Sequence, residues 1–213
     1  MSPYFIKICG ITTYEDAAAA VDAGATAIGF NFYRKSKRYI APERAKEIAE
    51  KVRGKIATVG VFVNERPEVV RAAGALVKLT YCQFHGDEDE EYVNRFPNAI
   101  KAFRVNDSLK GVYFDDYRAA AFLLDAYDEK EMGGTGKRFN WLLAREANEF
   151  GKIILAGGLT PENVEEAVSI VHPWGVDVSS GVESGEPGKK DHLKVRLFAE
   201  RARTAFQHML ETE

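Results

Sequence analysis

A lysine and a cysteine alternate with isoleucines near the start of the chain, within residues 5–12. A short apolar run closed by a glycine is typical of a buried strand, and successive side chains of a strand point to opposite faces. Lys7 and Cys9 therefore share one face, opposite Ile6 and Ile8. Because lysine is almost never fully buried without a partner, we expect this pair to point into a site at the end of the strand. The alternative is that Cys9 is a small core residue, as free cysteines often are.

Polar side chains also stand at the ends of other expected strands. They are Asn31, Gln83, His85, Asp125, Asp177 and Ser179. A single histidine or aspartate in such a place is commonly a cap or a loop anchor. Polar groups at the same end of most strands are harder to explain by packing, so together they predict a functional site at the carboxyl ends of the strands.

The elements that must position these residues alternate between strand and helix. Strands are predicted to end at Cys9 and to cover residues 26–32, 56–63, 79–84, 99–105, 120–124, 153–156 and 175–179. Helices are predicted over residues 13–23, 42–52, 67–75, 88–96, 139–150, 161–171 and 193–210, with a weak or short helix within 106–118. Several of these helices are expected to open with a proline, at Pro42, Pro67 and Pro161.

Eight strand–helix units in succession imply a parallel sheet, because each helix returns the chain in the same direction. Such a series closes into a (β/α)8 TIM barrel, here a single α/β domain over residues 1–213. An open doubly wound sheet is the alternative, but no Gly-x-Gly-x-x-Gly follows the first strand. Active sites of (β/α)8 barrels lie at the carboxyl ends of the strands, where the polar residues fall.

Two glycine-containing stretches are candidate anion sites. Gly157 and Gly158 follow the seventh strand, and Ser180 and Gly181 follow the eighth. Loops after these strands frequently bind phosphate in such barrels, and backbone N–H groups at helix N-termini favour anions. Two ordinary tight turns are the alternative. Residues 133–137 (GGTGK) resemble part of a P-loop but lack its first glycine, so we interpret them as a flexible active-site loop rather than a nucleotide site.

Composition excludes several classes of function. The chain has 213 residues, a net charge of −3 and an isoelectric point near 5.9, which argues against a nucleic-acid or membrane-surface partner. We see no apolar run long enough to span a bilayer and no signal peptide, so we expect a cytoplasmic protein. The two cysteines, Cys9 and Cys82, match no zinc spacing, and we expect no metal and two reduced thiols.

The motifs in their order closely resemble those of the phosphoribosylanthranilate isomerases of tryptophan biosynthesis, over nearly the whole chain. The motifs are KICGIT (7–12), GFNF (29–32), SKRY (36–39), VGVFVN (59–64), QFHGDE (83–88), LD (124–125), GGTGK (133–137), LAGGLTPENV (155–164) and GVDVSSGVE (175–183). The resemblance implies a cofactor-free Amadori rearrangement of N-(5-phosphoribosyl)anthranilate, a small phosphorylated substrate. It leaves open whether the enzyme is a monomer or a homodimer.

The resemblance also implies roles for individual residues. Asp125 would be the general acid that protonates the ribose ring oxygen, and Cys9 the general base that removes the C2 proton. Arg38 would bind the anthranilate carboxylate. The remaining substrate-binding residues would be His85, Gly157, Gly158, Asp177, Ser180 and Gly181.

The two proton-transfer groups have opposite needs. A carboxylic acid is ionised at neutral pH unless an apolar setting or its ligand holds the proton. A free thiol titrates near about 8.5, so the pKa of Cys9 must be lowered for it to act as a base. Lys7 is the candidate cation for this, although it could instead simply pair with Asp177.

Three residues depart from the family pattern, at Lys37, Asn31 and Asn140. They put the details of anthranilate binding and of the loop after the sixth strand in question, but not the reaction. Two other functions were considered: a related phosphate-binding barrel such as indole-glycerol-phosphate synthase, and a sugar-phosphate binder without turnover. The presence of both Cys9 and Asp125 argues against each.

Overall fold

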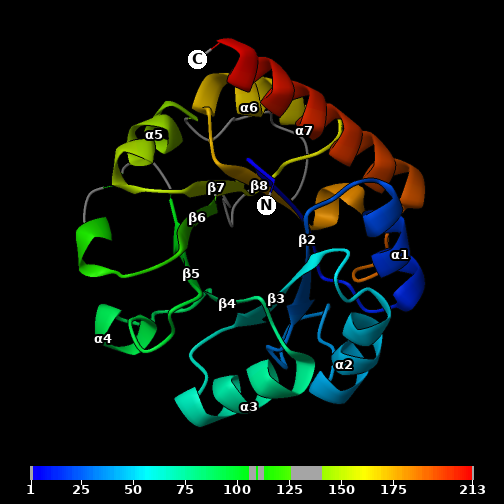
Figure 1. The fold of residues 1–213 in the computed structure, drawn as a ribbon, viewed down its shortest axis with the longest axis vertical. Helices are drawn as coiled ribbons and strands as arrows, with labels where there is room; N and C mark the ends of the chain where they lie inside the picture. The colour runs from blue at the N-terminus through cyan, green and yellow to red at the C-terminus, as the bar shows by residue number, and fades with distance from the viewer. Residues whose placement is uncertain (1, 106–108, 110–112, 126–140, 213) are drawn as a thin grey trace.

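The structure is a computed structural model that describes residues 2–105, 109, 113–125 and 141–212. Parallel strands follow one another in sequence order around a closed barrel, and β8 pairs with β1 to close it (Figure 1). The strands are β1 Phe5–Cys9, β2 Ala27–Asn31, β3 Ala57–Phe62, β4 Tyr81–Phe84, β5 Ala99–Arg104, β6 Ala121–Asp125, β7 Ile153–Ala156 and β8 Gly175–Val178. The predicted (β/α)8 barrel is confirmed.

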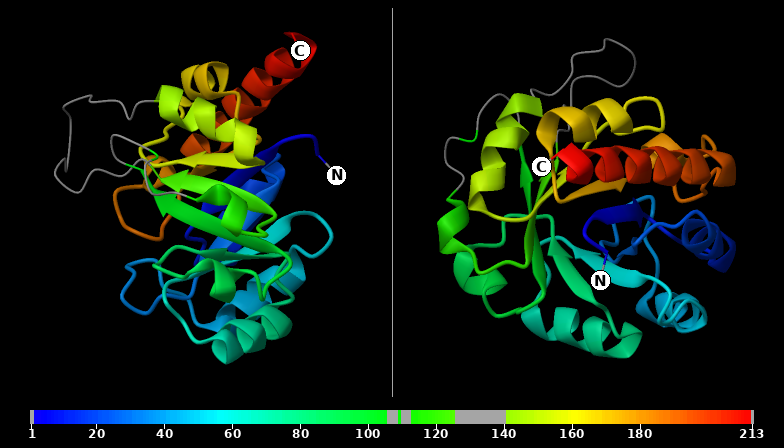
Figure 2. Two further views of the ribbon diagram at one scale, coloured as in Figure 1. Left: turned by 90° about the vertical axis from the view of Figure 1, so that its left-hand side faces the viewer. Right: turned by 45° about the horizontal axis from the view of Figure 1, so that its top comes forward.

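Helices surround the barrel, as the views in Figures 1 and 2 show. The α-helices are α1 Tyr14–Asp22, α2 Pro42–Lys51, α3 Pro67–Val77, α4 Glu90–Val93, α5 Trp141–Glu146, α6 Val164–Val171 and α7 His192–Thr212. Short 3-10 turns are η1 Phe114–Asp116, η2 Ala147–Phe150 and η3 Ser180–Val182. The long helix α7 packs between α1 and α6 and so covers the strand pair where the barrel closes.

Local chemistry explains most helix starts. The Thr13 side chain accepts a hydrogen bond from the Asp16 N–H at 3.2 Å and thereby caps α1. Pro42 and Pro67 occupy the first positions of α2 and α3, where a missing N–H costs nothing. The prediction that Pro161 also begins a helix is wrong, since α6 begins at Val164.

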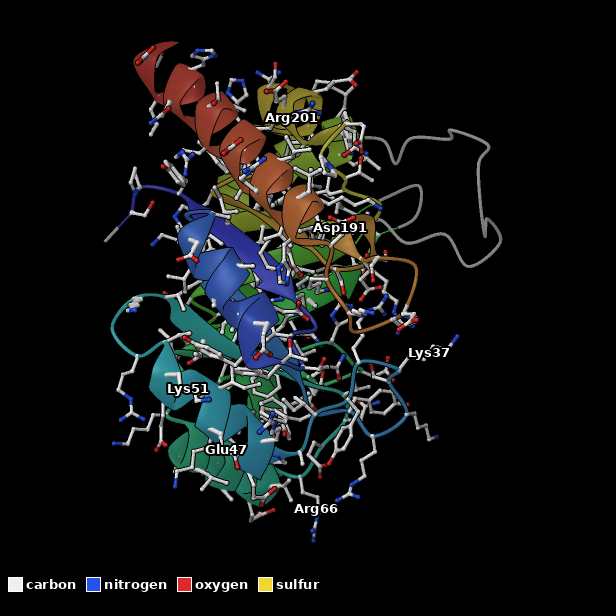
Figure 3. All side chains as sticks on the ribbon, turned by 90° about the vertical axis from the view of Figure 1, so that its right-hand side faces the viewer. Lys37, Glu47, Lys51, Arg66, Asp191 and Arg201 are labelled. Atoms are coloured by element: carbon white, nitrogen blue, oxygen red, sulfur yellow. The ribbon has the colours of Figure 1, made fainter. Side chains whose placement is uncertain are left out.

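Pro161 lies in a turn that side-chain hydrogen bonds hold in place. Asn163 Oδ1 accepts the Thr160 N–H at 2.8 Å, and its Nδ2 donates to the Gly158 carbonyl at 3.0 Å. Arg201 of α7, labelled in Figure 3, donates to the Pro161 carbonyl at 2.6 Å. These bonds hold the chain in a turn against the glycines that follow β7, and the helix can begin only after it.

Two other helices are shorter than predicted. Of the helix expected over residues 88–96, only α4 is helical. Asp89 is its N-cap and accepts the Tyr92 N–H at 2.8 Å, and the side chain of Glu88 accepts the Asn64 N–H instead. Of the helix expected over residues 139–150, the described part is α5 followed by the 3-10 turn η2. Within residues 106–118 the described part contains η1.

The apolar residues form two cores on the two faces of the barrel wall. The larger lies between strands and helices. The smaller fills the barrel interior and consists of Phe5, Ala27, Val59, Ile100, Ala102, Ala121, Leu123, Ile154 and Ala156. Because side chains alternate along a strand, the interior face of β1 carries Lys7 and Cys9 above Phe5. Lys7 is 0% exposed, which makes a lysine part of the barrel interior.

Candidate active site

The inner face of β1 carries a lysine that is paired across the closing strand. Lys7 lies opposite Asp177 in the register of β1 and β8. Its ammonium donates to both carboxylate oxygens of Asp177 at 3.0 Å each, and both side chains are buried. A lysine inside a barrel requires such a partner, because an isolated buried charge is too costly. The structural pairing that the sequence left open is therefore present.

Cys9 stands one layer nearer the rim on the same face of β1. Burial raises the pKa of its thiol above the ordinary value, and the nearby Asp177 carboxylate adds to this, while Lys7 and the more distant Lys190 lower it. The net direction is upward because burial is the larger cause, although Lys7 acts on the thiol in the expected direction. Burial would also lower the pKa of Lys7, but the charges of and hydrogen bonds to Asp177 and Cys9 together outweigh it, and the pKa is raised. Lys7 thus stays charged beside the thiol and limits the upward shift.

A glycine on β2 makes room for this pair. Gly29 lies opposite Cys9 in the register of β1 and β2. A Cβ atom there would stand 2.8 Å from Cys9 Sγ and 3.0 Å from Lys7 Cε, closer than side chains tolerate. The absence of a side chain at this position lets the thiol and the lysine stem fold toward the barrel axis together.

The other proton-transfer candidate lies on β6. Asp125 ends the strand facing inward, with 21% of its side chain exposed. Its Oδ2 lies 3.1 Å from Nε2 of His85, the residue that follows β4. The second ring nitrogen, Nδ1, lies 3.1 Å from Nε2 of Gln83, which is itself buried. A chain Gln83–His85–Asp125 therefore runs along the rim from β4 to β6.

Gln83 is a residue that the sequence analysis noted but did not assign to the site. Its parity with His85 was the signal, because residues two apart on a strand share a face. Among the described residues, its Oε1 is a buried side-chain oxygen with no hydrogen-bond partner. Nothing on that side locks the amide, and its orientation follows the proton on His85 Nδ1.

The glycines after β7 adopt backbone conformations that only glycine takes easily. Gly157 and Gly158 have φ of +84° and +66°. The bond from Asn163 to the Gly158 carbonyl keeps this segment folded against the barrel end. A Cβ on Gly158 would meet no atom of the described residues within 4 Å, so there is open space beside this peptide.

The loop after β8 packs directly onto the loop after β7. Ser180 and Gly181 begin the 3-10 turn η3. A Cβ on Gly181 would collide with the Leu159 carbonyl oxygen, so the two loops touch through their backbones. The four residues expected to bind phosphate thus come together in one place between β7 and β8.

Arg38 reaches the rim from the loop after β2. Its stem crosses Gly10, where a Cβ would stand 2.7 Å from Arg38 Cδ, so the guanidinium lies near the end of β1. Its Nε and Nη2 donate to Glu183 Oε1 and Oε2, both at 2.7 Å. This bond raises the pKa of Arg38. The neighbouring Lys37 is exposed and points away from the barrel in Figure 3.

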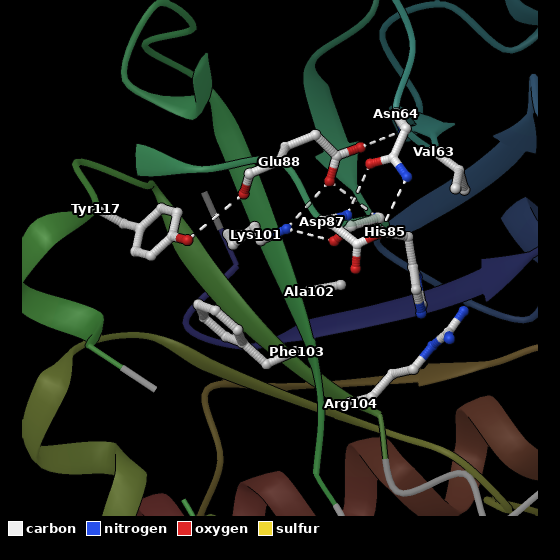
Figure 4. A pocket seen from close by; sticks show the side chains of 11 residues that line it. Val63, Asn64, His85, Asp87, Glu88, Lys101, Ala102, Phe103, Arg104 and Tyr117 are labelled. Atoms are coloured by element: carbon white, nitrogen blue, oxygen red, sulfur yellow. Dashed lines mark hydrogen bonds and ion pairs between the residues drawn. The ribbon is translucent and has the colours of Figure 1, made fainter. Parts of the chain in front are cut away.

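A pocket of about 360 Å³ opens beside His85 at the ends of β4 and β5 (Figure 4). On its outer wall Lys101 donates to Glu88 at 3.1 Å and to the Gly86 carbonyl at 2.8 Å. Glu88 also accepts the Asn64 N–H at 2.7 Å. Both members of this ion pair are buried, and their bonds tie the loops after β3 and β4 to β5.

Some expectations fall outside the described residues. These are the GGTGK loop at 133–137 and the departure at Asn140. Within the described residues no three His, Cys, Asp or Glu side chains are grouped so that they could hold a metal ion. No described helix is both long and apolar enough to cross a membrane.

Comparison with known proteins places the chain among characterised relatives. The family model of N-(5'phosphoribosyl)anthranilate (PRA) isomerase matches residues 6–201. An N-(5'-phosphoribosyl)anthranilate isomerase of Geotalea uraniireducens is 53% identical over 93% of this chain and 98% of its own. The phosphoribosyl anthranilate isomerase of Thermotoga maritima is 41% identical with a TM-score of 0.86, over 94% of this chain and 99% of its own. A phosphoribosyl anthranilate isomerase solved with reduced 1-(o-carboxyphenylamino)-1-deoxyribulose 5-phosphate is 39% identical with a TM-score of 0.81, over 94% and 99%.

Proposed function

Because the chain belongs to the N-(5'-phosphoribosyl)anthranilate isomerase family, which acts in tryptophan biosynthesis, we propose that Asp125 and Cys9 are its acid and base. The observation that supports the assignment is their placement. Both side chains face inward at the carboxyl ends of strands, Cys9 on β1 and Asp125 on β6, and therefore approach one ligand from two sides of the barrel mouth.

The reaction begins with a proton transfer to the sugar. Asp125 donates a proton to the ring oxygen of the ribose, the ring C–O bond breaks, and the aminoaldose opens to a protonated Schiff base. The contact with His85 at 3.1 Å gives this carboxyl group a fixed direction. General acid catalysis of this kind contributes about 10²–10⁴ in rate.

The second transfer takes place at C2. The Cys9 thiolate removes the C2 proton, and the C–H electron pair forms the enolamine as the Schiff-base nitrogen becomes neutral. Tautomerisation of the enolamine then gives the ketone. Burial raises the pKa of Cys9. The positive charge of Lys7, and that of the Schiff base once it forms, both favour the thiolate.

Substrate binding uses the two ends of the molecule. The phosphate would lie on the main chain of Gly157, Gly158, Ser180 and Gly181, and the anthranilate carboxylate on Arg38. Asp177 would act through Lys7, to which it is bound, rather than by touching substrate. The place of the reaction in amino-acid synthesis favours a cytoplasmic location.

A fluorescence assay of phosphoribosylanthranilate generated in situ tests the assignment. We expect turnover by the wild type and a loss of about a thousandfold in Cys9→Ser and in Asp125→Asn, with both variants still folded. Turnover that survives Asp125→Asn would move the acid to another residue. Binding without wild-type turnover would instead indicate a binding protein or a sister reaction.

A further inference from the structure

Glu183 is a buried carboxylate that is fully occupied by donors. Oε1 accepts from Arg38 Nε at 2.7 Å, from the Gly188 N–H at 2.9 Å and from Lys190 Nζ at 3.3 Å. Oε2 accepts from Arg38 Nη2 at 2.7 Å. Burial would raise the pKa of Glu183, but the hydrogen bonds and the two cations outweigh it and the pKa is lowered. Glu183 is therefore held as an anion by four donors, three of them on Oε1.

This pairing leaves one edge of Arg38 available. A guanidinium has five N–H donors and can hold one carboxylate on its Nε/Nη2 edge and another on its Nη1/Nη2 edge. Glu183 occupies the first edge. Among the described residues, none accepts a hydrogen bond from Nη1 on the second edge, and 26% of the Arg38 side chain is exposed. Glu183 thus orients Arg38, but it also cancels its charge.

Lys190 is the cation that makes the cluster positive again. Its side chain is 0% exposed, and its Nζ donates to Glu183 and, at 3.0 Å, to the Ser179 carbonyl. Its backbone N–H donates to the buried Asp16 of α1 at 3.3 Å, which fixes this part of the loop. Burial lowers the pKa of Lys190, and the charge of Glu183 opposes this. With Lys190 protonated, the three groups Arg38, Glu183 and Lys190 carry one net positive charge.

We propose that Lys190 is a specificity-determining residue. Together with Arg38, which Glu183 orients, its buried charge makes this subsite select an amine that carries a carboxylate. The inference rests on the proposed function in that Arg38 faces the anthranilate carboxylate. Without Lys190, the carboxylate of a ligand would bind an Arg38–Glu183 pair with no net charge, and the negative charge of Glu183 would lie close to it. With Lys190 in place, two carboxylates and two cations balance when the ligand is bound.

The test measures the affinities of two ligands by titration calorimetry. The first is reduced 1-(o-carboxyphenylamino)-1-deoxyribulose 5-phosphate, and the second is the same molecule without the carboxyl group. The affinity ratio is the affinity for the first ligand divided by that for the second. We expect Lys190→Met to weaken binding of the first about tenfold and to leave the second unchanged, as loss of one nearby charge requires. Equal weakening of both ligands, or of neither, would overturn the proposal.

Further variants separate charge from folding. Glu183→Gln should raise the affinity ratio severalfold, because the cluster gains a net charge; a lower ratio would contradict the inference. The double variant Lys190→Met/Glu183→Gln should return to the wild-type ratio. Lys101→Met is the matched control, because it removes another buried lysine from a glutamate pair on the far side of the barrel. Its ratio should not change.

Arg38→Met distinguishes this inference from the proposed function. If its affinity ratio stays at the wild-type value, the assignment of Arg38 to the carboxylate fails. If the ratio falls with Arg38→Met and not with Lys190→Met, the function stands and only the role of Lys190 is overturned.

Discussion

The two sides of the barrel mouth hold Cys9 and Asp125, the proposed base and acid, in different ways. On the β8–β1 side, Cys9 adjoins the buried ion pair of Lys7 and Asp177, in which every charge has a partner. On the β4–β6 side, Asp125 and His85 are each 21% exposed and meet through one hydrogen bond. Cys9 therefore lies beside fixed, buried charges, whereas Asp125 lies at the more open rim beside one polar partner.

Removal of Lys7 should reduce stability most, because it acts on the β8–β1 side. Lys7→Met leaves Asp177 buried without its cation, which costs about 3–5 kcal/mol of unfolding free energy. The pKa of Cys9 should rise further, because Lys7 lowers it in the wild type. Urea denaturation and the pH profile of iodoacetamide labelling measure the two effects.

The control for this variant is again Lys101→Met. It breaks a comparable buried pair and should lower stability, but it should leave the labelling profile of Cys9 as in the wild type. A wild-type labelling profile in Lys7→Met would show that Lys7 is structural alone.

A smaller change tests the space around the thiol. Gly29→Ala places a methyl group 2.8 Å from Cys9 Sγ, which should cost about 1–3 kcal/mol of stability and reduce turnover, because Cys9 must shift. Thermal unfolding and the activity assay measure both. Gly74→Ala is the matched control, since its Cβ in α3 would lie 4.0 Å from its nearest neighbour. It should stabilise the protein by about 0.5–1 kcal/mol. Full activity in Gly29→Ala would contradict a tight fit at the thiol.

A substitution on the β4–β6 side should have a smaller effect. His85→Asn removes the partner of Asp125 but leaves the acid in place, so we expect a loss of about tenfold in kcat. A loss as large as that of Asp125→Asn would show that His85 itself transfers the proton. Steady-state kinetics of the two variants, side by side, decide between these outcomes.

The smallest effects are expected at the second thiol. Cys82 is buried between strand and helices, and burial raises its pKa to about 11. Cys9 is partly exposed whereas Cys82 is buried, so iodoacetamide at pH about 8 should label Cys9 before Cys82. Mass spectrometry of labelled peptides measures the order. Cys82→Ala should keep wild-type turnover, and a loss of activity would give Cys82 a role that its position does not predict.

Several parts of the architecture were predictable because they depend on local patterns. The alternation of apolar strands and capped helices predicted the barrel, and residue parity predicted that Lys7 shares a face with Cys9. The start of α6 was not predictable in this way. Pro161 is a good first helical residue, but the bonds from Asn163 and Arg201 to the preceding turn outweigh that preference.

The sequence by itself determined the fold class, the reaction family and the strand ends at which Cys9, Asp125 and the two glycine loops stand, because residue type, order and period suffice for these. The tertiary structure decided which charges meet. Glu183 reaches Arg38 across 145 positions of the chain, Lys190 joins them through Glu183, and Asp177 reaches Lys7 across 170. Such contacts exist only once the barrel closes β8 onto β1, and they, not the residue types, set the charge that surrounds Cys9 and Arg38.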